Sequence, residues 1–160
     1  MRKMVVLLVT LCTLIGFAMP VSAHDDSVSA RAHQRPINDS GIHSQITFMD
    51  TGTSLIVDGK AHHLDPAKRY FSLLYDNASV PTGPNACEET NNSLTEDQMF
   101  AGLWDSKTET LHTVKTGALY TAVGTFATMS IRQLLDPNGP ISPANQKLVA
   151  CGQVRIEHAH

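Results

Sequence analysis

The chain has 160 residues and a mass of 17.4 kDa, which is enough for one domain with its own hydrophobic core but not for two ordinary domains. The formal net charge is −3 with neutral histidines. An acidic chain is a poor match for nonspecific nucleic-acid binding, which depends on neutralising phosphates. An odd number of cysteines, three, and a surplus of eight histidines are the features that need an explanation.

Residues 1–23 are typical of a secretory signal peptide. Arg2 and Lys3 precede an apolar run at 4–19, and Val21-Ser22-Ala23 resembles an A-x-A cleavage site. The run is shorter than the roughly 18 to 20 residues that a spanning helix needs, so no membrane span is expected. We predict cleavage after Ala23 and a secreted or periplasmic protein.

Cleavage changes both the charge and the cysteine count. It removes Arg2, Lys3 and Cys12, which takes the net charge from −3 to −5 and leaves Cys87 and Cys151. In an oxidising compartment, two cysteines predict first a disulfide. The alternative, a thiolate pair that binds a metal, lacks the C-x-x-C spacing typical of such sites.

The exported chain begins with a polar segment, 24–40, which has no apolar period and is expected to be a flexible N-terminal arm. After Ile42, short runs rich in β-branched and aromatic residues predict strands. These runs are 44–49, 53–58, 69–75, 98–104, 109–115, 119–134 and 147–157.

Two segments rich in Pro, Gly and Asn, 76–97 and 135–146, predict long loops, and the first contains Cys87. Helical periodicity is absent from the sequence beyond a turn. We therefore predict an all-β domain over 41–157, an antiparallel sandwich or Greek-key barrel, followed by a tail at 158–160.

Two short segments resemble the copper/zinc superoxide dismutases. Leu148-Val149-Ala150-Cys151-Gly152 is similar to the Leu-Ala-Cys-Gly-Val type sequence of that family's last strand, and Leu64-Asp65-Pro66 resembles the Gly-Leu-x-Pro-Gly turn that leads into a central strand. The resemblance covers most of 42–157. It implies an immunoglobulin-like Greek-key β-sandwich or barrel of the superoxide dismutase-like type, and a disulfide between Cys87 and Cys151.

The resemblance also implies that the metal centre of the family is missing. The family holds copper mainly by imidazoles, and a His-x-His pair comes from the strand corresponding to 70–75. Here Ser72, Leu74 and Arg132 stand at copper-ligand positions, and no histidine occurs between Cys87 and Trp104, where the zinc ligands would fall. We therefore expect no catalytic residues, no cofactor and no dismutase activity.

The histidines lie mostly elsewhere. His24 would offer an α-amino nitrogen with its imidazole, and His158 and His160 form an H-x-H pair, so these three are candidate ligands for copper or zinc. The alternative is that they are solvated tail residues. Adjacent strand residues face opposite ways, so His62 and His63 can ligate one ion only if they lie in a turn.

Three functions are compatible with these features. The one we favour is a noncatalytic binding module whose long loops present a surface to an unidentified protein or small ligand. The second is an extracytoplasmic copper or zinc binding protein that uses the N-terminal and C-terminal histidines. The third is a divergent dismutase with residual redox activity. Fold alone does not choose among them, because function has to be argued from a site.

Overall fold

The computed structural model describes residues 27–76, 86–87 and 92–157. They form one eight-stranded antiparallel sheet with the strand order β5-β4-β7-β8-β1-β2-β3-β6. The strands are β1 (Val28–Pro36), β2 (His43–Asp50), β3 (Ser54–His62), β4 (Tyr70–Asp76), β5 (Phe100–Trp104), β6 (Thr110–Thr116), β7 (Phe126–Leu134) and β8 (Gln146–Glu157).

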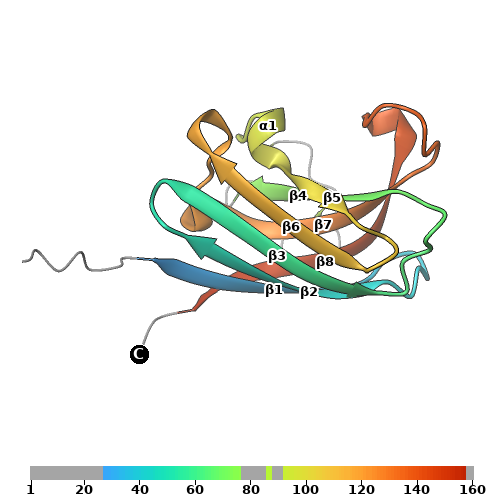
Figure 1. The fold of residues 1–160 in the computed structure, drawn as a ribbon, viewed down its shortest axis with the longest axis horizontal. Coiled ribbons are helices and arrows are strands. Elements are labelled where there is room, and N and C mark those ends of the chain that lie inside the picture. The colour runs from blue at the N-terminus through green and yellow to red at the C-terminus, as the bar shows by residue number, and fades with distance from the viewer. Residues whose placement is uncertain (1–26, 77–85, 88–91, 158–160) are drawn as a thin grey trace, which may run out of the picture.

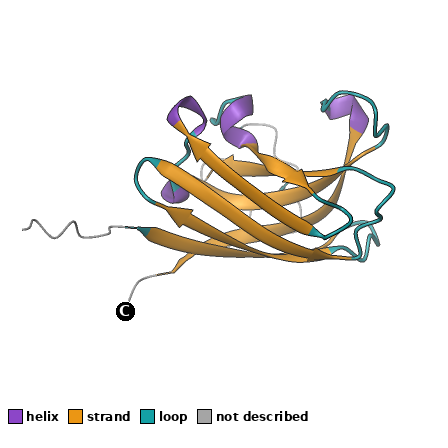
Figure 2. Cartoon of the chain, viewed as in Figure 1, coloured by secondary structure: helices purple, strands orange, loops and turns teal. Residues whose placement is uncertain are grey.

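Among the described residues, helical structure is confined to single turns at the ends of strands, as Figure 2 shows. These turns are α1 (Glu96–Met99), η1 (Gly117–Leu119), η2 (Val123–Thr125) and η3 (Pro143–Asn145). Within the described part of the chain, no helix has the length and apolarity needed to cross a membrane. The all-β prediction is confirmed.

The sheet curls until its two edge strands, β5 and β6, contact each other, so that it forms a nearly closed barrel (Figure 1). Strict alternation gives the curled sheet a buried inner face: along β2 every second side chain is buried, Ile46 and Phe48 among them. At the meeting edges, Gly102 faces Thr113 so closely that a Cβ atom would collide with the threonine side chain. The absence of a side chain on Gly102 therefore lets the edges approach.

The prediction of a flexible arm over 24–40 is wrong for residues 28–36. Residues 28–36 form β1, which lies inside the sheet and pairs with both β2 and β8. Its buried positions hold Ala30, Ala32 and Gln34, and small or polar residues of this kind give no apolar period in the sequence. Gln34 is satisfied inside the barrel, because its Nε2 donates to the Met129 carbonyl at 2.8 Å and its Oε1 accepts from Ser44 Oγ at 2.7 Å.

Lys115 is a buried cation that fixes α1 to the end of β6. Its side chain is 2% exposed, and its Nζ donates to the carbonyl oxygens of Asp97, Gln98 and Phe100 at 3.1, 2.5 and 2.7 Å. These bonds satisfy orphan carbonyls at the C-terminal end of the helical turn. Burial nevertheless lowers the pKa of Lys115 from its ordinary 10.5 to about 8, and the nearby carboxylate of Asp97 opposes part of that shift.

This pKa predicts a pH dependence of stability. Between about pH 8 and pH 10.5 the unfolded chain keeps the Lys115 proton while the folded chain has lost it, so the contribution of this group to stability rises with pH by about 1 kcal/mol per pH unit. Urea unfolding should show this slope in the difference between the wild type and Lys115→Met. The exposed-lysine variant Lys107→Met should keep the wild-type slope, and a flat difference for Lys115→Met would contradict the argument.

Candidate binding surface

A disulfide joins Cys87 to Cys151, with 5.9 Å between the Cα atoms, and this pairing is confirmed. It ties the segment that follows β4 to the last strand, and a small apolar cluster with Tyr75 and Leu148 surrounds it. Arg132 holds the same segment, since its Nη2 donates to the Cys87 carbonyl at 2.7 Å and its Nε donates to the Tyr75 hydroxyl at 3.0 Å. A disulfide of this kind fits an extracellular space.

The positions that would hold copper in the dismutases have structural roles here. Ser72 and Leu74 are fully buried, and Ser72 Oγ accepts a hydrogen bond from Trp104 Nε1 at 2.9 Å. Arg132 binds Tyr75 and Cys87 as described above. Every histidine in the described part of the chain is exposed. The core around Ser72 and Leu74 therefore contains no imidazole from these residues.

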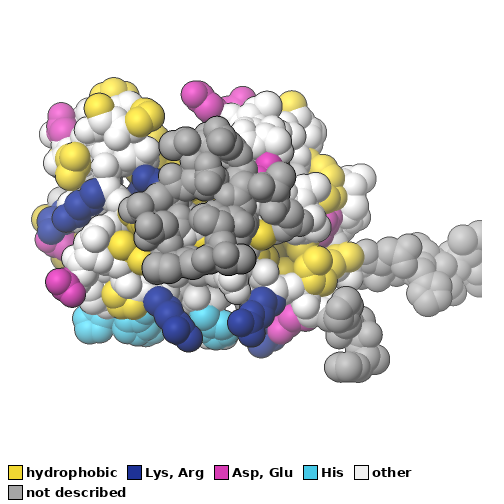
Figure 3. Space-filling view, turned by 180° about the vertical axis from the view of Figure 1, so that it is seen from behind, with side chains coloured by type: hydrophobic (Ala, Val, Ile, Leu, Met, Phe, Trp, Pro, Cys, Tyr) yellow, Lys and Arg dark blue, Asp and Glu magenta, His cyan; other side chains and the backbone are white. Residues whose placement is uncertain are grey.

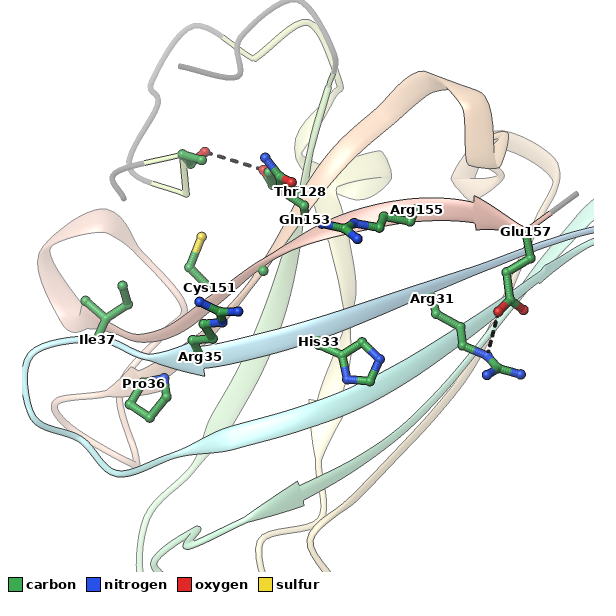
Figure 4. A pocket seen from close by; sticks show the side chains of 12 residues that line it. Arg31, His33, Arg35, Pro36, Ile37, Thr128, Cys151, Gln153, Arg155 and Glu157 are labelled. Atoms are coloured by element: carbon green, nitrogen blue, oxygen red, sulfur yellow. Dashed lines mark hydrogen bonds and ion pairs between the residues drawn. The ribbon is translucent and has the colours of Figure 1, made fainter. Parts of the chain in front are cut away.

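A hollow of about 810 Å³ opens on the outer face of β1 and β8, beside the disulfide. Figure 4 shows its side chains, and the polar and cationic ones come from alternate positions of the two strands: Arg31, His33 and Arg35 from β1, and Gln153 and Arg155 from β8. The guanidinium of Arg155 extends toward Gln153, while Arg35 lies near Cys151. The surface is therefore cationic although the chain as a whole is acidic.

The floor of the hollow is a place where two strands come unusually close. The β1–β8 ladder pairs Ala32 with Val154 and Arg35 with Cys151 but forms no pair at the two β1 residues between them. There a Cβ atom on Gly152 would lie 2.9 Å from Gln34 Cα and would collide with the His33 carbonyl oxygen. The absence of a side chain on Gly152 therefore lets the backbones of β1 and β8 approach each other at this point.

The cations of the hollow are poorly neutralised. Arg31 and Arg155 are direct cross-strand partners, and like charges placed opposite each other destabilise a sheet. Arg31 Nε forms an ion pair with Glu157 Oε1 at 3.1 Å. Among the described residues, Arg35 and Arg155 form no ion pair. Two exposed guanidinium groups therefore remain available, and guanidinium recognises carboxylate and phosphate groups in a bidentate manner.

The histidines of the described residues lie on the outer face of the β1-β2-β3-β6 half of the sheet. Figure 3 shows histidine side chains gathered with Lys and Arg side chains along one edge of the molecule. The ring centroids of His43 and His62 are 4.9 Å apart, and those of His43 and His63 are 5.4 Å apart. His112 lies apart from these rings and binds Asp58 Oδ1 through Nδ1 at 2.6 Å.

The candidate ligands His24, His158 and His160 lie outside the described residues. In the placements that the described residues have, no three His, Cys, Asp or Glu side chains converge as metal ligands do. Sequence reasoning also missed the hollow. Its signal was the alternation of Arg31, His33 and Arg35, which places three basic side chains on one face of a strand.

Neither a model of a known protein family nor a curated protein matches this sequence. The resemblance to superoxide dismutases therefore depends on the short segments around Cys151 and Pro66 and on the disulfide.

The disulfide should make a large contribution to stability. The bond links residues that are 64 positions apart, and closing a loop of that size restricts the unfolded chain by about 4 kcal/mol on the chain-entropy model. We expect the double variant Cys87→Ala/Cys151→Ala to lose about that much free energy of unfolding in urea titrations. A loss below about 1 kcal/mol would contradict this prediction, since strain in the folded state would then cancel the constraint.

Proposed function

We propose that the chain is an exported, noncatalytic binding module that holds a small anionic ligand in the hollow between β1 and β8. The observation that carries this proposal is the pair of exposed guanidinium groups on Arg35 and Arg155, which have no carboxylate partner among the described residues. Arg155 also stands directly opposite Arg31. Because like charges placed opposite each other destabilise a sheet, the cations on this face are better explained by a ligand than by the fold.

The size of the hollow favours a small molecule. Its volume of about 810 Å³ lies within the range of roughly 300 to 1,000 Å³ that is usual for small-ligand sites. Arg35 and Arg155 supply fork-shaped donors, and Gln153 supplies an amide beside them. A ligand with two or more carboxylate or phosphate groups would match this arrangement, because each guanidinium can bind one oxoanion in a bidentate manner.

The scaffold in this proposal is a Greek-key barrel of the copper/zinc superoxide dismutase-like type. The strand order supports it: β4, β5 and β6 are consecutive neighbours around the barrel, and β7 returns after a long connection to lie beside β4. The disulfide from the segment after β4 to the last strand supports it as well, because the resemblance implies that pairing.

The same proposal treats the chain as inactive in superoxide dismutation. The support is that the copper-ligand positions serve packing, with Ser72 bonded to Trp104 and Leu74 in the core. Imidazole coordination at those positions would require rebuilding the centre of the barrel. Cleavage of a signal peptide at residue 23 belongs to the proposal too, and that segment lies outside the described residues.

Anion binding can be measured directly. Isothermal titration of the untagged exported protein with citrate and with pyrophosphate, at low constant ionic strength, should show saturable binding to one site. Arg35→Gln and Arg155→Gln should each weaken binding about tenfold or more, because each removes charge-assisted hydrogen bonds. Lys107→Gln, which makes the same charge change on the exposed β5–β6 turn, should leave the affinity unchanged.

Two results would overturn this proposal. One is the absence of saturable binding by either anion in the wild-type protein. The other is a loss of folding stability, rather than of binding, in the Arg35 and Arg155 variants, since the arginines would then serve the fold. Unfolding curves of each variant, recorded beside the titrations, separate the two effects.

Dismutase activity provides a separate test. After incubation with copper and zinc and removal of unbound metal, the exported protein should show no superoxide dismutation above a control that contains the same amount of free metal. The physical reason is that Ser72 and Leu74 offer no imidazole where the reaction needs a redox-active copper. Activity well above the control would show that ligands from other positions assemble a redox centre.

A further inference from the structure

We propose that His43, His62 and His63 form a binding site for a Zn²⁺ ion on the outer face of the barrel, at the end of the β2–β3 ladder. These histidines are outside the hollow proposed above and outside the terminal segments. The proposal stands on the backbone at His63, on the spacing of the rings and on the hydrogen bond of His43.

The backbone brings two adjacent histidines to one partner. His43 and His62 are direct cross-strand partners, so their side chains leave the sheet on the same face. The next residue would normally face the other way. His63, however, has a φ of 69°, in the left-handed region that non-glycine residues seldom adopt. This turn directs the His63 ring to the same side, where it also contacts His43.

The spacing of two of the three ring pairs is compatible with imidazoles on one metal ion. A zinc–nitrogen bond is about 2.0 Å, so a ring centroid lies about 3.2 Å from the ion, and two rings at a tetrahedral angle have centroids about 5.2 Å apart. The measured centroid separations are 4.9 Å for His43 and His62 and 5.4 Å for His43 and His63. The rings are stacked and tilted rather than convergent, and rotation about side-chain bonds is the change that zinc binding requires.

The free-energy cost of rotating these side chains is small at this position. All three histidines are exposed, so their rings can turn without disturbing the core. The energy of binding then has to exceed only the cost of fixing these exposed side chains in one rotamer each. Surface imidazoles that already contact one another have lost part of that freedom before the ion arrives.

His43 already has the hydrogen bond that orients a metal ligand. Its Nδ1 lies 3.3 Å from the carbonyl oxygen of Gly41. A carbonyl can only accept, so in the neutral ring this bond places the hydrogen on Nδ1 and leaves the lone pair on Nε2. A backbone carbonyl that holds the second ring nitrogen in this way is the usual outer partner of a zinc-bound histidine. Three imidazoles would leave a fourth position for water or an anion.

The charges around the three rings come from few residues. Lys60 lies on the same face of β3, two residues before His62, and Asp65 is engaged by Lys68 at 3.3 Å. The other carboxylates near the rings are those of Glu109, whose Oε1 accepts from the Leu64 backbone N–H at 3.1 Å, and of Asp39, which lines a second hollow together with His63. Imidazole nitrogens select a borderline ion such as Zn²⁺ over Ca²⁺ or Mg²⁺, which prefer oxygen ligands.

Zinc titration with a set of matched variants tests the site. Calorimetry of the untagged exported protein with Zn²⁺ alone should give one ion per chain at this site, and NMR should show changed ring signals for His43, His62 and His63. Each of His43→Gln, His62→Gln and His63→Gln should weaken zinc affinity about tenfold or more, since loss of a ligand should cost at least as much as loss of an outer partner. His112→Gln removes an exposed imidazole from the same sheet and should leave the affinity unchanged.

The terminal histidines are tested in the same series. His24→Ala and the double variant His158→Ala/His160→Ala should retain the zinc affinity and the NMR changes at the three rings. The proposal is overturned if the wild-type protein binds no zinc, if the terminal variants abolish binding, or if the three cluster variants bind as tightly as His112→Gln. Urea unfolding midpoints confirm that each variant is folded, because all three positions are exposed and should tolerate glutamine.

Discussion

The pairing of β1 with β8 is the interaction on which the rest of this structure depends. It joins the β5-β4-β7-β8 half of the sheet to the β1-β2-β3-β6 half. Without it, each half would be an open four-stranded sheet with one more exposed edge. Because the first strand pairs with the last, the barrel can close only when nearly the whole chain is available. Gln34 strengthens this closure from inside through its bonds to Met129 and Ser44.

The same junction generates the cationic hollow. Where the β1–β8 ladder lacks two residue pairs, the absence of a side chain on Gly152 lets the two backbones approach, and the hollow lies on the outer face there. Alternation then sets the lining: because Ala32 and Gln34 point inward, Arg31, His33 and Arg35 must point outward. The disulfide at Cys151 lies at one end and fixes β8 to the segment after β4. The geometry of the surface is thus a consequence of closing the barrel.

The sequence predicted the features that depend on residue type and missed those that depend on register. Enrichment in β-branched and aromatic residues located β2 and β3, and cysteine counting after signal removal predicted the Cys87–Cys151 pair. The prediction missed strand β1 because alanine and glutamine, rather than large apolar residues, fill its inward positions. The Arg31–Arg155 pair could not be predicted, because no local pattern reveals which residues of β1 and β8 stand opposite each other.

For the histidines too, the sequence reveals the residue types but not the register that brings them together. Their number is plain in the sequence, and the requirement that His62 and His63 share a turn before they can act together is a local rule. Whether the requirement is met depends on a single backbone angle, the φ of His63, and on the register that places His43 opposite His62. The buried centre around Ser72 is occupied by hydrogen bonding and packing, so imidazole chemistry in the described part of this barrel is confined to its outer surface. There, exposed side chains can change without altering the core, and binding properties are free to diverge while the scaffold is retained.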